Sequence, residues 1–100
     1  MNRNLRVLIT GTNKGIGNDL VKIFHRNHEN ATIYATSRES SKVAEQRWQE
    51  IDPLNQRIKA KYLDINSLDS IKSLSAELSR EKTLIDVVIH NAAVCDNLKD

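Results

Sequence analysis

Residues 5–17 have the sequence LRVLITGTNKGIG. The first half is a short apolar run, which is typical of a strand buried on both faces of a parallel sheet. The second half contains all three glycines of the chain, Gly11, Gly15 and Gly17. After the glycines the apolar residues adopt a helical spacing that continues to about His28. This stretch therefore predicts a strand over Leu5–Thr10, a glycine turn and a helix.

The rest of the chain alternates between strand and helix patterns. Further strands are predicted over Ala31–Thr36, Arg57–Leu63 and Leu84–Ile89. The two helices between them are predicted to begin at Ser40 or Ser41 and at Asn66 or Ser67, and to end before Pro53 and at Ser79. A β-α-β-α-β-α-β order with short links predicts an α/β, Rossmann-type parallel sheet with strand order 3-2-1-4.

The spacing of apolar residues also predicts which side chains face the core. In the second helix Ala44, Trp48 and Ile51 share one face, so Trp48 is interpreted as a packing residue. The apolar face of the third helix is predicted to contain Leu68, Ile71, Leu74 and Leu78. The last strand, Leu84–Ile89, is predicted to be buried, whereas His25 and His28 are expected to be solvated.

Charge alternates along the predicted third strand. Arg57, Lys59 and Lys61 fall on one side of it, and apolar residues fall on the other. This pattern predicts an exposed or edge strand that positive charge protects from pairing with another chain.

Composition narrows the classes of function. The net charge is +2, and the 15 basic residues are mixed with acids, which argues against a nucleic-acid partner. A single cysteine, Cys95, cannot form an internal disulfide, and no His, Cys and carboxylate cluster has metal-ligand spacing. No stretch has the length and hydropathy of a signal peptide or a membrane span. We therefore expect a cytoplasmic protein without a metal.

Glycines suit a turn that binds phosphate. They permit a tight turn, let the backbone approach a pyrophosphate, and let the following helix direct its N-terminal N–H groups at the anion. The glycines could instead serve only to connect a strand to a helix. Their spacing does not match the Gly-x-Gly-x-x-Gly fingerprint of dinucleotide-binding proteins.

Residues Thr10–Gly17 resemble the Thr-Gly-x-x-x-Gly-x-Gly turn of the short-chain dehydrogenases/reductases, and the Asn-Lys-Gly-Ile-Gly segment is most similar to the carbonyl reductase branch. Leu63–Ile65 and Leu68–Leu74 also resemble that branch. The resemblance covers nearly the whole chain. It implies that residues 1–100 are the N-terminal NADP-binding half of a Rossmann-fold domain in an oxidoreductase that reduces carbonyls or oxidises alcohols by hydride transfer.

The resemblance also implies a set of cofactor-binding residues, namely Gly11, Asn13, Lys14, Gly15, Ile16, Gly17, Arg38, Asp64, Ile65, Asn91 and Ala92. Ser37 stands where members of the family that use NAD have an acidic residue. Arg38 can form charge-assisted hydrogen bonds with a 2′-phosphate, and Lys14 can approach it as a point charge. NADP(H) is therefore the expected cofactor.

The remaining residues of the set have individual roles by resemblance. Asp64 would accept a hydrogen bond from the adenine amino group, with the Ile65 backbone beside the ring. Asn13 and Ile16 would line the phosphates, whereas Asn91 and Ala92 would border the ribose. The plainer alternatives are solvated surface charges for Lys14 and Arg38, a strand end or turn cap for Asp64, a turn former for Asn13 and a core residue for Ile16.

The chain departs from the family pattern at His90-Asn91-Ala92-Ala93, where the family usually has Asn-Asn-Ala-Gly. We interpret His90 as a hydrogen-bonding substitute rather than an acid or base. The family's catalytic Ser and Tyr-x-x-x-Lys cannot be placed, because Tyr34 and Tyr62 lie in predicted strands and neither has Lys at the fourth following position. No catalytic residue is assigned, and the chain alone is expected to be inactive.

The leading hypothesis is a fragment or truncated form of an NADPH-dependent enzyme. The complete protein would take a small carbonyl or alcohol substrate and could form a homo-oligomer. One alternative is a non-catalytic module that senses NADP(H) or binds a protein. Another is an interaction domain that uses the edge of the fourth strand, which is predicted to be unpaired and apolar.

Overall fold

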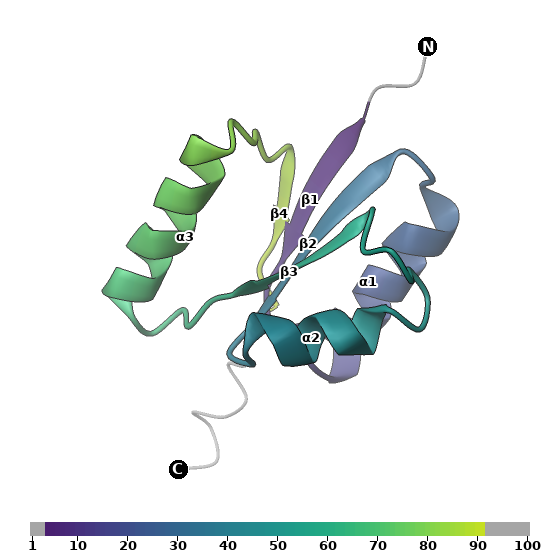
Figure 1. The fold of residues 1–100 in the computed structure, drawn as a ribbon, viewed down its shortest axis with the longest axis horizontal. Helices are drawn as coiled ribbons and strands as arrows, with labels where there is room; N and C mark the ends of the chain where they lie inside the picture. Colours follow the sequence, from purple (N-terminus) through teal and green to yellow (C-terminus); the bar gives the residue numbers. More distant parts are fainter. Residues whose placement is uncertain (1–3, 92–100) are drawn as a thin grey trace.

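The computed structural model describes residues 4–91, which form a four-stranded parallel sheet with helices on both faces (Figure 1). In chain order the elements are β1 (Leu5–Ile9), α1 (Gly15–Asn27), β2 (Ala31–Ser37), α2 (Ser41–Trp48), β3 (Ile58–Tyr62), α3 (Leu68–Arg80) and β4 (Val87–Ile89). The strand order is β3-β2-β1-β4, and each neighbouring pair is parallel. The predicted Rossmann-type order is therefore confirmed.

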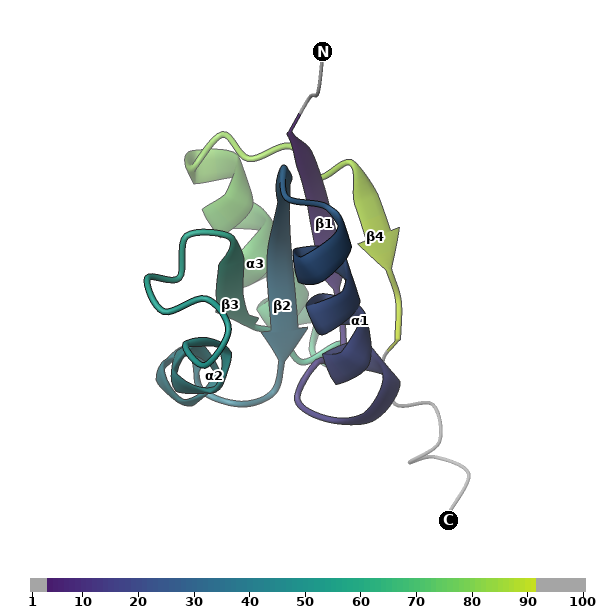
Figure 2. The same ribbon diagram turned by 90° about the vertical axis from the view of Figure 1, so that its right-hand side faces the viewer.

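Helices α1 and α2 cover one face of the sheet, and α3 lies on the other (Figures 1 and 2). Because the strands are parallel, the loops that follow them leave the sheet at a single edge. Ligands of open α/β sheets bind at that carboxyl edge. The fold thus brings together the glycine turn after β1 and the loops that follow β2, β3 and β4.

The main core lies between the sheet and helices α1 and α2. Alternate residues of the strands point into it, and their side chains pack with Val21 of α1 and with Ala44 and Trp48 of α2. Trp48 is 1% exposed, which confirms it as a packing residue. The buried members of this cluster are Val7, Ile9, Val21, Ala31, Ile33, Ala35, Ala44, Trp48, Ile58 and Ala60.

A smaller core lies on the α3 side. Leu8 of β1 and Tyr34 of β2 are buried there against Leu74 of α3, and half-buried residues such as Leu78 surround them. Leu68 and Ile71 were predicted to face the core, but they are 63% and 42% exposed. Within the described part of the chain α3 is the one helix on this face and covers the sheet only in part, so the N-terminal half of its apolar stripe stays in contact with solvent.

Serine side chains begin two of the helices. The hydroxyl of Ser40 accepts a hydrogen bond from the Val43 N–H at 3.3 Å, and that of Ser67 accepts one from the Ser70 N–H at 3.2 Å. These bonds satisfy N–H groups that have no partner within the helix. Both N-caps are among the residues predicted to begin these helices.

The second helix ends earlier than its apolar spacing predicted. It stops at Trp48, and Ile51 lies in the following turn, where it is 37% exposed. The buried Asp52 explains the early end, because its carboxylate accepts hydrogen bonds from the N–H groups of Arg57 and Ile58 at 2.8 and 2.7 Å. These bonds direct the chain away from the helix axis and into β3.

Strand β3 lies at the edge of the sheet as predicted, and two of the three basic residues expected to protect it, Arg57 and Lys61, bind neighbouring elements. The Arg57 guanidinium donates to the carbonyl oxygens of Ala31, His25 and His28. Lys61 forms ion pairs with Glu77 in α3 and, at 3.4 Å, with Glu81 at the C-terminal end of that helix. Both side chains therefore connect β3 to neighbouring elements.

Strand β4 is shorter and more exposed than the predicted buried strand. It spans three residues, and Val87 and Val88 are 38% and 63% exposed. Leu84, which precedes it, is 75% exposed. Within residues 4–91 only β1 pairs with β4, so this strand forms the second edge of the sheet. No helix of the described region is long and apolar enough to cross a membrane.

Candidate nucleotide-binding site

The turn between β1 and α1 has the backbone that its glycines permit. Gly11 and Gly15 adopt φ values of 66° and 64°, in the left-handed region where a side chain would be strained. A Cβ atom on Gly15 would meet no atom within 4 Å, so positive φ rather than crowding requires glycine there. The backbone at Gly15 is consequently open to approach, which is the property that a phosphate-binding turn needs.

Gly17 is required for a different reason. A Cβ atom at this position would collide with the carbonyl oxygen of Gly11 and would lie 2.6 Å from Nδ2 of Asn91. Helix α1 therefore packs so closely on the turn and on the chain after β4 that only glycine fits. Three of the predicted cofactor-binding residues, Gly11, Gly17 and Asn91, lie together in the structure.

The N-terminus of α1 is suited to an anion. Lys14 is the N-cap residue with φ −162°, and its side chain forms no capping hydrogen bond with the described residues. The first turn of α1 contains no acidic side chain. A helix N-terminus has unpaired N–H groups and a partial positive charge. Asn13, Lys14 and Ile16 are all exposed here, and Ile16 at 70% is therefore not the core residue of the alternative interpretation.

Buried threonines hold the turn in place, a role that the sequence did not suggest. The N–H and Oγ1 groups of Thr12 both donate to the Thr36 carbonyl oxygen at 3.1 Å. The Thr36 hydroxyl in turn donates to the Ile9 carbonyl oxygen at 3.0 Å. These bonds join the turn to the end of β2. The available signal was the presence of threonines near the carboxyl ends of two largely apolar strands.

A third threonine joins the turn to β4. The Thr10 hydroxyl accepts a hydrogen bond from the Asn91 N–H at 2.7 Å and lies 3.4 Å from Nδ1 of His90. The Asn91 side-chain amide is 3.5 Å from the Gly11 carbonyl oxygen. His90 thus makes a hydrogen bond of the kind expected for a substitute of asparagine. The predicted residue Ala92, like Ala93 and Cys95, lies outside the described residues.

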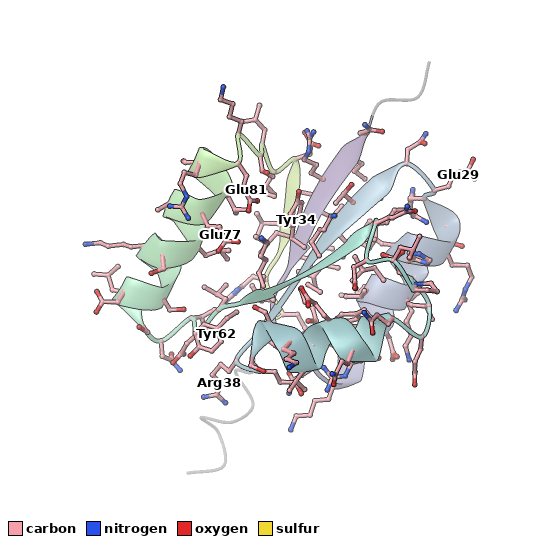
Figure 3. The ribbon with its side chains drawn as sticks, in the orientation of Figure 1. Glu29, Tyr34, Arg38, Tyr62, Glu77 and Glu81 are labelled. Carbon is pink, nitrogen blue, oxygen red and sulfur yellow. The ribbon has the colours of Figure 1, made fainter. Side chains whose placement is uncertain are left out.

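The end of β2 presents Arg38 at the same edge. Ser37 is 5% exposed, and its carbonyl oxygen accepts a hydrogen bond from the Leu63 N–H at 2.8 Å. Arg38 follows it as an exposed residue, and Figure 3 shows it beside Tyr62, the residue paired with Ser37 in the sheet. Lys14 and Arg38 therefore follow the carboxyl ends of adjacent strands, with both side chains exposed.

Asp64 begins the loop between β3 and α3. Its Oδ1 atom accepts a hydrogen bond from the Asn66 N–H at 3.0 Å, and its own N–H donates to the Ser70 hydroxyl at 2.9 Å. Its carbonyl oxygen accepts the Ser67 N–H at 3.0 Å. Asp64 therefore has the turn-capping role of the plainer alternative. It is half-buried, as is Ile65.

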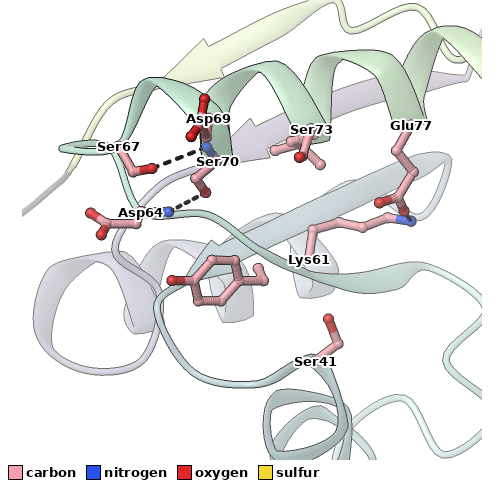
Figure 4. Close-up of a pocket in the computed structure, with 10 residues that line it drawn as sticks. Ser41, Lys61, Asp64, Ser67, Asp69, Ser70, Ser73 and Glu77 are labelled. Carbon is pink, nitrogen blue, oxygen red and sulfur yellow. Dashed lines mark hydrogen bonds and ion pairs between the residues drawn. The ribbon is translucent and has the colours of Figure 1, made fainter.

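A polar hollow of about 400 Å³ lies between β3, the start of α2 and α3 (Figure 4). Asp64 is at one end of it, and the Lys61–Glu77 ion pair is at the other. The lining residues are Ser41, Lys61, Tyr62, Asp64, Ser67, Asp69, Ser70, Ser73, Leu74 and Glu77. Of these, only Asp64 was among the predicted site residues, because polar helix residues give no sequence signal of a hollow.

The candidates for acid–base or metal chemistry that the structure describes elsewhere are not gathered into a site. His28 is exposed as expected, but His25 is half-buried. Burial and the nearby Arg57 guanidinium both lower the pKa of His25. Among residues 4–91, no three His, Cys, Asp or Glu side chains lie close enough together to hold a metal ion.

Comparisons of this chain with known protein families and structures agree with this geometry. The family model described as short chain dehydrogenase matches residues 5–100, so the chain belongs to the short-chain dehydrogenase family. Members of this family are oxidoreductases that bind nicotinamide cofactors. Retinol dehydrogenase 13 of Mus musculus is 31% identical over 88 residues, which are 88% of this chain and 26% of that protein. The chain thus spans about a quarter of the length of that relative.

Solved structures also share the fold. Menthone neomenthol reductase from Mentha piperita superposes with a TM-score of 0.78 at 21% identity, over 91% of this chain and 32% of that one. The NADPH-bound carbonyl reductase from chicken fatty liver superposes with a TM-score of 0.74 at 26% identity, over 90% and 35% of the two chains. In each case the similar region is about a third of the solved structure.

Proposed function

We propose that this chain is the NADP(H)-binding portion of an oxidoreductase that reduces carbonyls or oxidises alcohols by hydride transfer. The observation that supports it most directly is the turn between β1 and α1, where Gly15 has positive φ with open space above it and Gly17 has no room for a Cβ atom. Such a turn admits a pyrophosphate to the N-terminus of α1. This geometry supports the proposed pyrophosphate site.

The basic residues around this turn favour NADP(H) over NAD(H). A 2′-phosphate carries negative charge that an acidic residue at the end of β2 would repel. Here Ser37 occupies that position, and the exposed Arg38 follows it. Arg38 would hold the phosphate through charge-assisted hydrogen bonds, and Lys14 would add a second positive charge. One similar structure, the carbonyl reductase from chicken fatty liver, has NADPH bound.

The other site residues would bind the rest of the nucleotide. The backbones of Gly11, Gly15, Ile16 and Gly17, together with Asn13, would surround the pyrophosphate. Asp64 and Ile65 would contact the adenine, and Asn91 and Ala92 would border the ribose. Asp64 uses one carboxylate oxygen for the Asn66 N–H, and a carboxylate can accept several hydrogen bonds, so its turn-capping role is compatible with contact to an adenine amino group.

The chemical step belongs to the complete protein in this proposal. When bound, the nicotinamide of the cofactor would supply or accept the hydride. The residues of this chain would bind and orient the adenosine half of the cofactor, and residues beyond the chain would hold the substrate carbonyl or alcohol. Residues 1–100 alone would bind NADP(H) without turnover. Cytoplasmic location and homo-oligomerisation stay predictions.

Titration of the folded chain with NADPH and with NADH tests the cofactor assignment. We expect tighter binding of NADPH, and we expect Arg38→Ala to weaken NADPH binding about tenfold or more while changing NADH binding little. Arg26→Ala is the matched control, because Arg26 is an exposed arginine in the last turn of α1, at the opposite end of that helix from the turn. Equal affinity of the unmodified chain for the two cofactors would refute the 2′-phosphate assignment.

A further inference from the structure

An ion pair lies immediately beside Arg38. The Arg47 guanidinium of α2 binds the Glu39 carboxylate through two nitrogens, with Nη1 on Oε1 and with Nη2 2.6 Å from Oε2. Both side chains are partly buried, at 30% and 26% exposure for Arg47 and Glu39. Because two nitrogens bind two oxygens, the pair fixes the orientation of the Glu39 carboxylate.

The pair fixes the short loop between β2 and α2. Besides the bond to Arg47, the Glu39 N–H donates to the Ser37 hydroxyl at 3.3 Å. Hydrogen bonding and attraction from Arg47 lower the pKa of Glu39, so its carboxylate stays charged at neutral pH. A permanent negative charge therefore occupies the residue next to Arg38, and Arg47 determines where that charge points.

The position of this charge matters for the cofactor. A carboxylate released from Arg47 could pair with the neighbouring Arg38 guanidinium or repel a 2′-phosphate. It could also accept hydrogen bonds from a ribose that has a free 2′-hydroxyl, as acidic residues near this strand end do in NAD-binding sheets. Loss of the Arg47–Glu39 pair would thus shift selectivity away from NADP(H).

We infer that Arg47 is a positioning residue for cofactor selectivity: by holding the Glu39 carboxylate against α2, it leaves Arg38 to bind a 2′-phosphate. This inference rests on the proposed NADP(H) site. It assigns a function to a residue of α2 that would not itself touch the cofactor. The plainer interpretation is a partly exposed ion pair that contributes only to stability.

A double-mutant cycle separates the two interpretations. The unmodified chain, Arg47→Met, Glu39→Gln and the double variant are each titrated with NADPH and NADH at one fixed ionic strength. We expect Arg47→Met to reduce the NADPH:NADH affinity ratio about tenfold, and Glu39→Gln to preserve it. The double variant, which has the net charge of the unmodified chain, is expected to regain most of the ratio because the misplaced carboxylate is gone.

Controls distinguish this effect from general ones. Arg80→Met removes one positive charge from the exposed last residue of α3 and should leave the ratio unchanged. Urea unfolding of each variant checks that the chains are folded at the titration temperature. A purely structural role would lower binding of both cofactors in Arg47→Met and would give no rescue in the double variant.

The outcomes also separate this inference from the proposed function. If the unmodified chain prefers NADPH and Arg38→Ala removes that preference, but Arg47→Met retains it, then only the role of Arg47 is overturned. If the unmodified chain does not distinguish NADPH from NADH, both the NADP(H) assignment and the role of Arg47 are overturned. If Arg47→Met lowers the NADPH:NADH affinity ratio and the addition of Glu39→Gln restores it, both the NADP(H) assignment and the role of Arg47 are supported.

Discussion

A Cβ atom on Gly17 would collide with the carbonyl oxygen of Gly11, and this contact fixes how closely α1 approaches the turn. We expect Gly17→Ala to lower the free energy of unfolding by about 1–3 kcal/mol, because backbone atoms must move to admit the methyl group. NADPH affinity should fall as well, since the same movement displaces the proposed pyrophosphate site. Urea unfolding and NADPH titration measure the two effects.

Gly15→Ala provides a contrasting change in the same turn. A methyl group there meets no atom within 4 Å, but φ is 64°. Strain in the left-handed region should cost about 1 kcal/mol, without the displacement of α1. If Gly15→Ala destabilised the chain more than Gly17→Ala, crowding at Gly17 would not be the dominant constraint in the turn.

The Thr10 hydroxyl should be needed to hold the chain after β4. It accepts the Asn91 N–H at 2.7 Å, and Thr10 is 4% exposed. Thr10→Val keeps the shape of the side chain but leaves that N–H without this partner, so we expect a loss of about 1–2 kcal/mol in the free energy of unfolding. Thermal or urea unfolding monitored by circular dichroism gives the value.

Thr12→Val is the matched control for this substitution. It also removes a buried threonine hydroxyl, but the Thr36 carbonyl oxygen keeps its hydrogen bond from the Thr12 N–H. A smaller loss of stability than in Thr10→Val is therefore expected. Equal losses would indicate that burial of a methyl in place of a hydroxyl, rather than the unpaired Asn91 N–H, determines the effect.

Local patterns were sufficient to predict the glycine turn and the helix starts at Ser40 or Ser41 and at Asn66 or Ser67. Each of these depends on residues close together in the sequence, such as a serine and the N–H three residues later. The alternation of strand and helix with short links then restricted the topology to a parallel sheet. Gly11 and Gly17 were identified from the glycine pattern, whereas Asn91, which lies beside them, was implied by the resemblance to the family.

Features that depend on distant residues could not be predicted in this way. Thr10 and Asn91 are 81 positions apart, and the hydrogen bond between them exists only because β1 and β4 are neighbours. An apolar run such as Leu84–Ile89 indicates a strand but not how many neighbours cover it, and Val88 is consequently 63% exposed. The roles of Lys14 and Arg38 toward a 2′-phosphate likewise depend on a ligand and stay predictions.

The Asp52 carboxylate should make stability depend on pH. Burial alone raises the pKa of this carboxyl, but hydrogen bonds from the Ile58, Arg57 and Gln56 N–H groups outweigh burial and lower it overall. A carboxyl with a lowered pKa in the folded state contributes stability above its unfolded pKa of about 3.9, and that stability is lost as pH falls through the folded value. Asp52→Asn should therefore cost about 1–3 kcal/mol at pH 7.

The pH series for Asp52→Asn has a defined expected shape. The difference in free energy of unfolding between the unmodified chain and the variant should be constant near pH 7 and should shrink below about pH 4, where the carboxyl becomes protonated. Glu50→Gln, at an exposed position two residues earlier, should change the free energy of unfolding by no more than about 0.5 kcal/mol in either pH range. A difference that stayed the same down to pH 3 would contradict the role of the ionised carboxylate.

The Arg57 guanidinium should stabilise the end of α1 more than its charge alone can explain. Its Nε donates to the Ala31 carbonyl oxygen at 3.0 Å, and its Nη2 donates to that of His25 at 2.9 Å and to that of His28. Lys at this position keeps the charge near the helix C-terminus but loses the planar set of donors. We expect Arg57→Lys to lower the free energy of unfolding by about 1–2 kcal/mol, whereas Lys59→Arg should leave it nearly unchanged. Urea unfolding at 0.1 and 1 M salt tests the cause, because an effect of charge alone would disappear at high salt and the loss of directed hydrogen bonds would not.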